Sequence, residues 1–531
     1  MAAFLDVLLR GLALVCTSLA LGGVAWLRFV VRLAPGTKPD AADRRTLAIV
    51  AASSALAGAA QLAVMLVALT AVAGGGAWPI AQYLGTTFAQ TAIVRIALAV
   101  GVSLLAVRLA RRPGGRVAWL ALASGTIVLA ASSAVVSHAM GRIDHRVILI
   151  LLDAAHQVAG AVWVGALAHL TIYAIGRSPY AIGRSPDRRD EWPALARRSS
   201  TLAFSSVATL VAAGLALTWL YVGDARALVE TAYGVMIVSK MILLAAALVF
   251  AAANRRAVRS GLATAQSRTL FRYVEVELGL GVTVLFAAAS LTSLPPAVDV
   301  HDERATLAEV ASRFKPAAPR LTSPDIAELN RTTDPLMAPP GQRKQIERAW
   351  SEYNHHWAGF FVLSMGLLAA LERLGVRLAR HWPLVFFGLA AFLFVRNDPK
   401  AWPLGPAGFW ETLTVPDVLQ HRIFVLLVVL FGIFEWMVRT ERVAASPWAY
   451  VFPALCAVGG GLLLTHSHGM FNLKQEFLTE VTHVPLGLFG AFCGYGRWLE
   501  LRLPDSRRTS GWLSTACLTL VGVILLFYRE G

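Results

Sequence analysis

Histidine is the residue type in this sequence that most clearly offers chemistry, and several histidines stand at the ends of long apolar runs. His466 and His468 end one such run, within the stretch "LLLTHSHGMF". Imidazole binds copper, zinc and iron. Residues two positions apart point to different sides of a helix, so both rings reach one ion only where the helix ends, and Gly469 is a suitable terminator. Met470 adds a thioether of the kind that Cu(I) accepts.

Carboxylates accompany the other histidines of the second half. Acidic residues precede them by three or four positions: Glu352 before His355 and His356, Asp417 before His421, and Glu480, itself four after Glu476, before His483. Residues at this spacing share one helix face, so Glu476, Glu480 and His483 form one stripe if a single helix begins before Glu476. The carboxylates would bind a metal or orient the imidazoles. The helix dipole offers a simpler explanation, because it favours acidic residues in any first turn.

Ionisable residues also lie within apolar runs of the first half, where burial in lipid is costly. Asp153 and His156 are three positions apart in one run, and His138 ends the run before it. Lys240 and Glu277 lie in two consecutive runs. An ion pair between antiparallel helices is one expectation for them, and a Lys240 side chain that extends to the membrane surface is the other.

These observations define the predicted site. The predicted metal ligands are His138, His156, His355, His356, His421, His466, His468 and His483. The residues expected to support them are Asp153, Glu352, Asp417, Met470, Glu476, Glu480, Lys240 and Glu277. No catalytic residue is predicted.

The elements that must position these residues are membrane-spanning helices. The chain has 531 residues, of which 56% are hydrophobic and only 15% are charged, whereas soluble domains carry about 25% charge. Many apolar runs exceed the roughly 20 residues that cross a bilayer as a helix, and they are continuous rather than alternating. We therefore predict an all-α, polytopic membrane helical bundle with about fourteen spans in two halves.

A polar stretch separates the two halves. The predicted organisation is an eight-helix domain over 1–293, an extracytoplasmic polar linker over 294–352, and a six-helix domain over 353–531. The expected spans are 8–33, 46–73, 87–110, 117–137, 147–174, 201–222, 231–254, 271–293, 353–371, 383–396, 421–438, 447–466, 479–499 and 511–528. The run 383–396 is short enough to suggest a re-entrant segment.

Lysine and arginine set the predicted orientation. They cluster in alternate short loops, such as Arg108, Arg111 and Arg112 after the third run, while the loop 74–86 has none. Because cytoplasmic loops are rich in Lys and Arg, we expect the N-terminus outside the cytoplasm and a multi-pass protein in a bacterial inner membrane. This orientation places most of the histidines at the outer ends of helices.

The net charge and the cysteines argue against nucleic-acid binding and against disulfide or thiolate metal sites. The net charge of +16 comes from these short basic clusters, so nucleic-acid binding is not expected. The four cysteines all lie in apolar runs and form no C-x-x-C pair, so neither a disulfide framework nor a thiolate metal site is predicted. The first run lacks a clear cleavage site and is expected to be a span rather than a signal peptide.

Five segments of the first half follow one another in a familiar order. They are "SSAVVSHAMG", "LLDAAHQVAGAVWVGALAHL", "FSSVATLVAAGLALTW", "YGVMIVSKMILLAAALVFAAANRR" and "VEVELGLGVTVLFAAASLTSLPPA". They contain His138, His156, Trp163, Gly165, Tyr233, Gly234, Lys240, Glu277, Pro295 and Pro296. In order and spacing, residues 80–297 resemble the copper resistance protein D family of bacterial inner-membrane proteins. Ala166 is a departure, because the family commonly has a second Gly after the Trp, which affects helix packing more than ligation.

The resemblance implies copper handling, by uptake across the inner membrane or as copper tolerance. It implies copper as the bound metal, the lipid bilayer as surroundings, and a periplasmic copper-binding protein as a candidate partner. No P-loop sequence is present to drive a pump, which favours a transporter or metal-binding protein over an enzyme. The alternative is a membrane redox protein in which the facing histidines bind haem b, or bind non-haem iron together with carboxylates.

Overall fold

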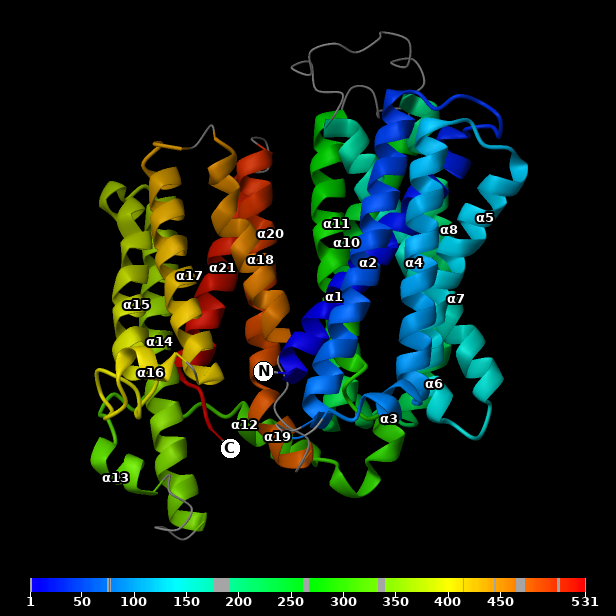
Figure 1. Ribbon diagram of the computed structural model, residues 1–531. Helices are drawn as coiled ribbons and strands as arrows, with labels where there is room; N and C mark the ends of the chain where they lie inside the picture. Colours follow the sequence, from blue (N-terminus) through cyan, green and yellow to red (C-terminus); the bar gives the residue numbers. More distant parts are fainter. Residues whose placement is uncertain are drawn as a thin grey trace. The chain divides into compact units, whose positions relative to one another are not determined.

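The protein is all-α, as predicted. The computed structural model describes residues 2–73, 76, 78–175, 192–260, 267–332, 340–413, 415–443, 446–464, 473–503 and 507–530. Within these ranges, thirteen helices are long and apolar enough to cross a membrane. The other expected span, 353–371, is the C-terminal part of the longer helix α14 (Pro340–Arg373). The fold class expected from the apolar runs is therefore confirmed (Figure 1).

The segment that was expected to be short proves longer. Residues Arg377–Leu384 form a 3-10 helix, η6, that continues directly into α15 (Val385–Arg396). Together they make a run of 20 residues with enough length and apolarity to span the membrane. The sequence pattern missed this because Arg377, Arg380 and His381 lie in the segment just before the apolar run that begins at Pro383. The length argument for a re-entrant segment no longer holds.

The chain divides into two compact units. The N-terminal unit comprises Ala2–Leu228 and Met236–His301, and the C-terminal unit comprises Val229–Val235 and Asp302–Gly531. The main helices of the first are α1 (Ala2–Ala25), α2 (Ala41–Ala73), α4 (Thr87–Arg111), α5 (Arg116–Ala131), α7 (Arg146–Ile175), α8 (Trp192–Val222), α10 (Ala232–Arg259) and α11 (Ser267–Leu291). Those of the second are α12 (Leu307–Arg313), α14, α15, α17 (Pro416–Arg439), α18 (Val451–Leu464), α19 (Leu473–Glu480), α20 (His483–Arg502) and α21 (Arg507–Leu526).

Helix α1 is the central element of the N-terminal unit, where it packs against α2, α5, α7 and α11 (Figure 1). Its crossing with α7 is tight because Gly22 faces Gly165, and a Cβ on Gly165 would overlap the backbone of Ser18. Small residues allow membrane helices to approach to backbone contact. Beside this crossing, Gly23 leaves room for the ring of His169, whose Nε2 lies 2.9 Å from the carbonyl oxygen of Leu19. These glycines fix the position of α7, which carries the predicted ligand His156.

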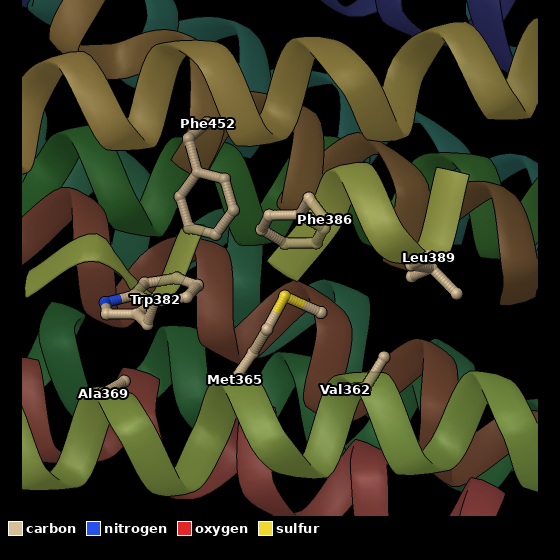
Figure 2. Close-up of a cluster of buried hydrophobic side chains, with 7 residues drawn as sticks. All are labelled: Val362, Met365, Ala369, Trp382, Phe386, Leu389 and Phe452. Atoms are coloured by element: carbon tan, nitrogen blue, oxygen red, sulfur yellow. The ribbon is translucent and has the colours of Figure 1, made fainter. Parts of the chain in front are cut away.

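The C-terminal unit has an aromatic core. Val362, Met365 and Ala369 on α14 face Trp382, Phe386 and Leu389 on η6 and α15, and Phe452 of α18 completes the cluster (Figure 2). Phe386 and Phe452 lie 6.0 Å apart between ring centroids, in a tilted arrangement. Such pairs add stabilisation to the area they bury.

A buried network of ions joins α14, α17 and α20 at their C-terminal ends. Glu435 binds Arg439 at 2.6 Å and Arg497 at 3.0 Å, and its own side chain is fully buried. Glu500 receives two hydrogen bonds from Arg373, at 2.8 and 2.9 Å, and a further contact from Arg497 at 2.9 Å. Together with Glu372, which pairs with Arg439 at 2.8 Å, the network contains three arginines and three glutamates. Because these charges balance, the network holds three helices together without an uncompensated buried charge.

Candidate functional site

The predicted ligand His156 lies in the N-terminal unit with a fixed ring orientation. It is positioned by α7, and its Nδ1 lies 2.9 Å from the carbonyl oxygen of Leu210 on α8. A carbonyl can only accept, so Nδ1 carries the proton and Nε2 keeps a lone pair. The ring fits against α8 because residue 214 is glycine; a Cβ there would lie 2.9 Å from Cε1 of His156. A backbone carbonyl that holds one imidazole nitrogen is the usual support of a metal-binding histidine.

Charged groups surround His156. The Asp153 side chain, one turn earlier on α7, accepts a hydrogen bond from Gln157 at 3.0 Å. Lys240 on α10 lies within electrostatic range of both Asp153 and His156. The structure thus brings three predicted residues together: His156, Asp153 and Lys240. The carboxylate offsets part of the repulsion between the ammonium and a cation at His156.

The expected Lys240–Glu277 ion pair is wrong. Glu277 on α11 is buried and accepts hydrogen bonds from Trp163 Nε1 at 3.2 Å and from Asn254 Nδ2 at 3.4 Å. Because α10 and α11 are consecutive in the chain, Glu277 meets the end of α10 that contains Asn254. Lys240 lies fourteen residues earlier, about 21 Å along the helix. Trp163 and Asn254 are visible in the sequence. The sequence does not show how α7, α10 and α11 align, and that alignment makes these two residues the partners of Glu277.

His138 lies at a second polar position in the N-terminal unit. It begins the short helix α6 (His138–Gly141), and its Nε2 lies 3.2 Å from the carbonyl oxygen of Leu291. Its ring meets the edge of Tyr221, with 6.5 Å between centroids. The same tyrosine ring lies under the guanidinium of Arg142, which pairs with Asp299 at 2.8 Å. His138 is thus part of an aromatic and ionic cluster at one end of the unit.

In the C-terminal unit, two predicted ligands from different helices come together. The ring of His355 on α14 lies 5.7 Å from the ring of His483, the first residue of α20. Nδ1 of His355 lies 2.9 Å from the carbonyl oxygen of Ser351, which leaves Nε2 with a lone pair. Two imidazoles that share one ion have centroids roughly 6 Å apart, because each metal–nitrogen bond is about 2 Å long. The spacing therefore suits a shared ion.

Tyr528 forms the third side of this histidine pair, and sequence reasoning missed it. Its ring stacks on His355 at 4.0 Å and meets the edge of His483 at 5.8 Å. Burial raises the pKa of the Tyr528 phenol above its ordinary value, so the phenol stays neutral. No local signal marked it, because it is the last residue of the expected span 511–528 and has no histidine near it in the sequence.

His356 has a different role from that of its neighbour. Its ring is completely buried, its Nδ1 accepts a hydrogen bond from the backbone N–H of Arg320 at 2.7 Å, and its Nε2 donates to the carbonyl oxygen of Tyr528 at 2.8 Å. Both nitrogens are thus engaged, and no lone pair remains for a metal. His356 ties the polar stretch and the chain end to α14, and we leave it out of the site proposed below.

The remaining predicted residues are dispersed. His421 on α17 pairs through Nδ1 with Asp398 at 2.8 Å, and Glu352 pairs with Arg320 at 3.6 Å. Asp417 lies in the first turn of α17. The expected stripe of Glu476, Glu480 and His483 on one helix is wrong, because α19 ends at Glu480 and α20 begins at His483.

Three predicted residues, His466, His468 and Met470, lie outside the described residues. Among the residues that the structure does describe, no three His, Cys, Asp or Glu side chains converge closely enough to hold one metal ion. The described part of the C-terminal unit therefore supplies the pair His355 and His483 rather than a full ligand set.

A family model matches part of the N-terminal half of the chain. Residues 193–291 match the family model of copper resistance protein D, which confirms the resemblance over that segment. The chain is also 29% identical over 268 residues to the copper transport protein CutJ of Bacillus subtilis (strain 168). That similarity covers 49% of this chain and 47% of the relative, so it spans about half the length of either protein. No solved structure matches this chain.

Proposed function

We propose that this protein handles copper in a bacterial inner membrane, as a transporter or as a tolerance protein. One observation carries the proposal: the segment 193–291, which matches copper resistance protein D, supplies the surroundings of His156. It includes Leu210, whose carbonyl orients the ring, and Gly214, which makes room for it. It also includes Lys240, the cation next to the histidine. His156 itself lies on α7, before the matched segment, and its neighbours Leu210 and Gly214 lie within that segment.

The chemistry of this place suits transient binding of copper. Nε2 of His156 offers one lone pair, and the Asp153 carboxylate supplies negative charge nearby. Lys240 opposes permanent occupancy, because its positive charge acts electrostatically on this position and repels a bound cation in a medium of low dielectric constant. Conduction across a membrane requires a position that binds the ion neither too tightly nor too weakly.

We propose the pair His355 and His483 as a second position for copper. The rings lie 5.7 Å apart and come from α14 and α20. His421 keeps a lone pair on Nε2, since its Nδ1 donates to Asp398, so it stays a candidate for a separate, weaker position. The parts expected of His466, His468 and Met470 stay predictions.

We also propose the orientation that the basic loops predict, with the N-terminus and the polar stretch 294–352 outside the cytoplasm. Copper delivered by a periplasmic copper-binding protein would then reach the histidine positions from that side. Reporter fusions test this directly: a reporter active only outside the cytoplasm should be active after residue 322 and inactive after residue 258. The opposite pattern would contradict the proposed direction of delivery.

The experiment that tests the function is copper movement by the purified protein in vesicles. We expect copper to accumulate in vesicles that contain the wild-type protein, and accumulation to fall at least tenfold for His156→Ala. The matched control is His381→Ala, since His381 accepts a hydrogen bond from Trp436 at 2.9 Å and belongs to neither proposed position. Equal accumulation in empty vesicles would contradict transport.

An optical spectrum of the same preparation tests the redox alternative. A protein that carries haem b shows an intense Soret band, whereas copper handling requires none. Metal analysis separates non-haem iron from copper. A stoichiometric iron content without copper after growth in copper-supplemented medium would replace the proposal by the redox alternative.

A further inference from the structure

The C-terminal unit brings together two cysteines that lie far apart in the sequence. Cys456 is on α18 and Cys493 is on α20, and each lies next to a residue at the close backbone contact between these two helices, Ala457 and Gly494. Neither belongs to a C-x-x-C pair, so no thiolate site was predicted from the cysteine spacing. The proximity comes entirely from helix packing.

Glycines beside the two cysteines produce this proximity. A Cβ on Gly494, the residue after Cys493, would lie 2.5 Å from the carbonyl oxygen of Pro453 and 2.7 Å from the backbone nitrogen of Ala457, the residue after Cys456. One turn along α18, a Cβ on Gly460 would lie 2.5 Å from the carbonyl oxygen of Gly487. The backbones of α18 and α20 are therefore in contact at the level of the two thiols, which holds the sulfur atoms in a fixed relation.

The surroundings of the pair are largely apolar, with Cys493 buried and Cys456 partly buried. Cys493 is 3% exposed. Cys456 packs against the aromatic core cluster that Figure 2 shows, which includes Met365, Trp382 and Phe452. Such surroundings exclude water and hard ligands, so they favour a soft ion over a hydrated one.

Two polar groups are available to stabilise negative charge on the sulfur atoms. Oγ of Ser514 on α21 lies 3.4 Å from Sγ of Cys493. The guanidinium of Arg497, one turn further along α20, is within electrostatic range of the same sulfur, as is the carboxylate of Glu435. Arg497 belongs to the charge-balanced ion network, so the pair lies beside a structure that already tolerates buried charge.

We propose that Cys456 and Cys493 form a two-coordinate thiolate site for a soft monovalent metal ion, Cu(I). Structural zinc sites and iron–sulfur clusters take four protein ligands, and catalytic zinc sites take three. Among the described residues, no third His, Cys, Asp or Glu joins these two closely enough to complete a larger set. Two sulfur ligands satisfy a d¹⁰ ion that accepts linear coordination, and thiolates are the ligands that Cu(I) prefers.

Binding is a simple exchange without a change of oxidation state. Cu(I) forms one bond to each sulfur, and each thiol releases its proton, so two protons leave and the complex carries one negative charge. The Ser514 hydroxyl then donates to the sulfur of Cys493. The choice of Cu(I) over another soft ion such as Ag(I) rests on the proposed function, whereas the ligand geometry is independent of it.

The test is Cu(I) titration of the purified, reduced, full-length protein against a chromophoric Cu(I) chelator, without oxygen. We expect the wild-type protein to bind one more equivalent of Cu(I) at high affinity than either Cys456→Ser or Cys493→Ser. The matched control is Cys16→Ser, since Cys16 is as buried as Cys493 but lies in the N-terminal unit. Its Cu(I) affinity and stoichiometry should equal those of the wild-type protein.

A second measurement keeps the proposal falsifiable if the serine variants fold poorly. X-ray absorption of the wild-type protein with one equivalent of Cu(I) should show a shell of two sulfur atoms. A shell of nitrogen or oxygen alone, full Cu(I) binding by both serine variants, or a disulfide between the two cysteines in protein isolated without oxygen would each overturn the site. Vesicle transport separates the two proposals: loss of transport with an intact two-sulfur shell contradicts only the function.

Discussion

At the scale of single residues, the histidines divide by what their ring nitrogens do. His156 and His355 each have one nitrogen bound to a backbone carbonyl, which leaves the other with a lone pair. His356 has both nitrogens engaged and serves the fold. From sequence spacing, both His355 and His356 were predicted to be metal ligands, because adjacent residues have the same local sequence pattern. Only the three-dimensional partners separate a candidate ligand from a structural histidine.

Lys240 offers a prediction at this scale. Replacement by Gln removes the positive charge next to His156 and Asp153 while keeping a side chain of similar length. The repulsion between Lys240 and a bound cation disappears, so Lys240→Gln should hold copper at least tenfold more tightly and release it more slowly. Equilibrium dialysis with copper measures the affinity. Weaker copper binding by Lys240→Gln would show that the ammonium supports the site rather than opposing the ion.

At the scale of helices, glycine contacts and buried ions determine which elements touch. Gly165 allows α1 and α7 to meet, and Gly494 allows α18 and α20 to meet. The sequence suggested Gly165 through a family resemblance, but it did not identify Ser18 as the facing residue. It gave no indication that α18 and α20 cross beside Cys456 and Cys493. Apolar periodicity predicts that a helix spans the membrane, but it does not predict the neighbour.

The α1–α7 crossing predicts that Gly165→Ala is destabilising. The added Cβ would overlap the backbone of Ser18, so the helices must separate, at a cost of about 1–3 kcal/mol. The matched control is Gly101→Ala on α4, where a Cβ meets no neighbouring atom. That substitution should be neutral or slightly stabilising, since Ala favours a helix by up to about 1 kcal/mol over Gly. Thermal unfolding in detergent measures both, and equal melting temperatures would refute the packing argument.

The ion network makes a second prediction about helix packing. Glu435→Gln leaves Arg439 and Arg497 without their shared carboxylate in a buried position, and loss of one partner from a buried pair costs about 3–5 kcal/mol. Glu352→Gln serves as the control, because its contact with Arg320 at 3.6 Å is partly exposed and should contribute less than about 1 kcal/mol. Denaturation of both variants in the same detergent compares the two losses. A smaller loss for Glu435→Gln than for Glu352→Gln would mean that the network is dispensable.

The polar stretch contributes a pH-dependent contact between α12 and α19. Glu309 caps α12 through the N–H of Thr306 and binds Lys474 of α19 at 2.9 Å, with Arg313 also nearby. The hydrogen bonds from Thr306 and Lys474 lower the pKa of Glu309 to about 2. Because the pKa is lower in the folded state than the ordinary value near 4.5, the contact is fully present above that value and is lost as the pH falls toward about 2.

Hydrogen exchange of α12 and α19 between pH 5 and pH 2.5 measures this loss, after correction for the intrinsic pH dependence of exchange. Protection of both helices should decrease together in the wild-type protein. In Glu309→Gln it should be low at every pH and should change little. A wild-type profile that matches that of Glu309→Gln would contradict a role for this carboxylate.

At the scale of the whole molecule, the apolar runs predicted the class of protein and nearly all of its spans. They did not predict the continuity of η6 with α15, because charged residues lie just before the run. The apolar runs also did not show that the candidate copper positions divide between the two units. His156 lies within the N-terminal unit, whereas the pair His355 and His483 lies within the C-terminal unit. The segment that matches copper resistance protein D, residues 193–291, contributes Leu210, Gly214 and Lys240 near the first of these places and contains neither histidine of the second.

The central claim is that His156 binds copper in its setting of Asp153, Leu210 and Gly214. The most direct test is the copper stoichiometry of purified wild-type protein, His156→Ala and the control His381→Ala, after loading with copper and removal of excess metal. We predict that His156→Ala retains at least one copper ion fewer than the wild-type protein, and that His381→Ala retains as many. Equal copper content in all three proteins, or none in any, would contradict the account.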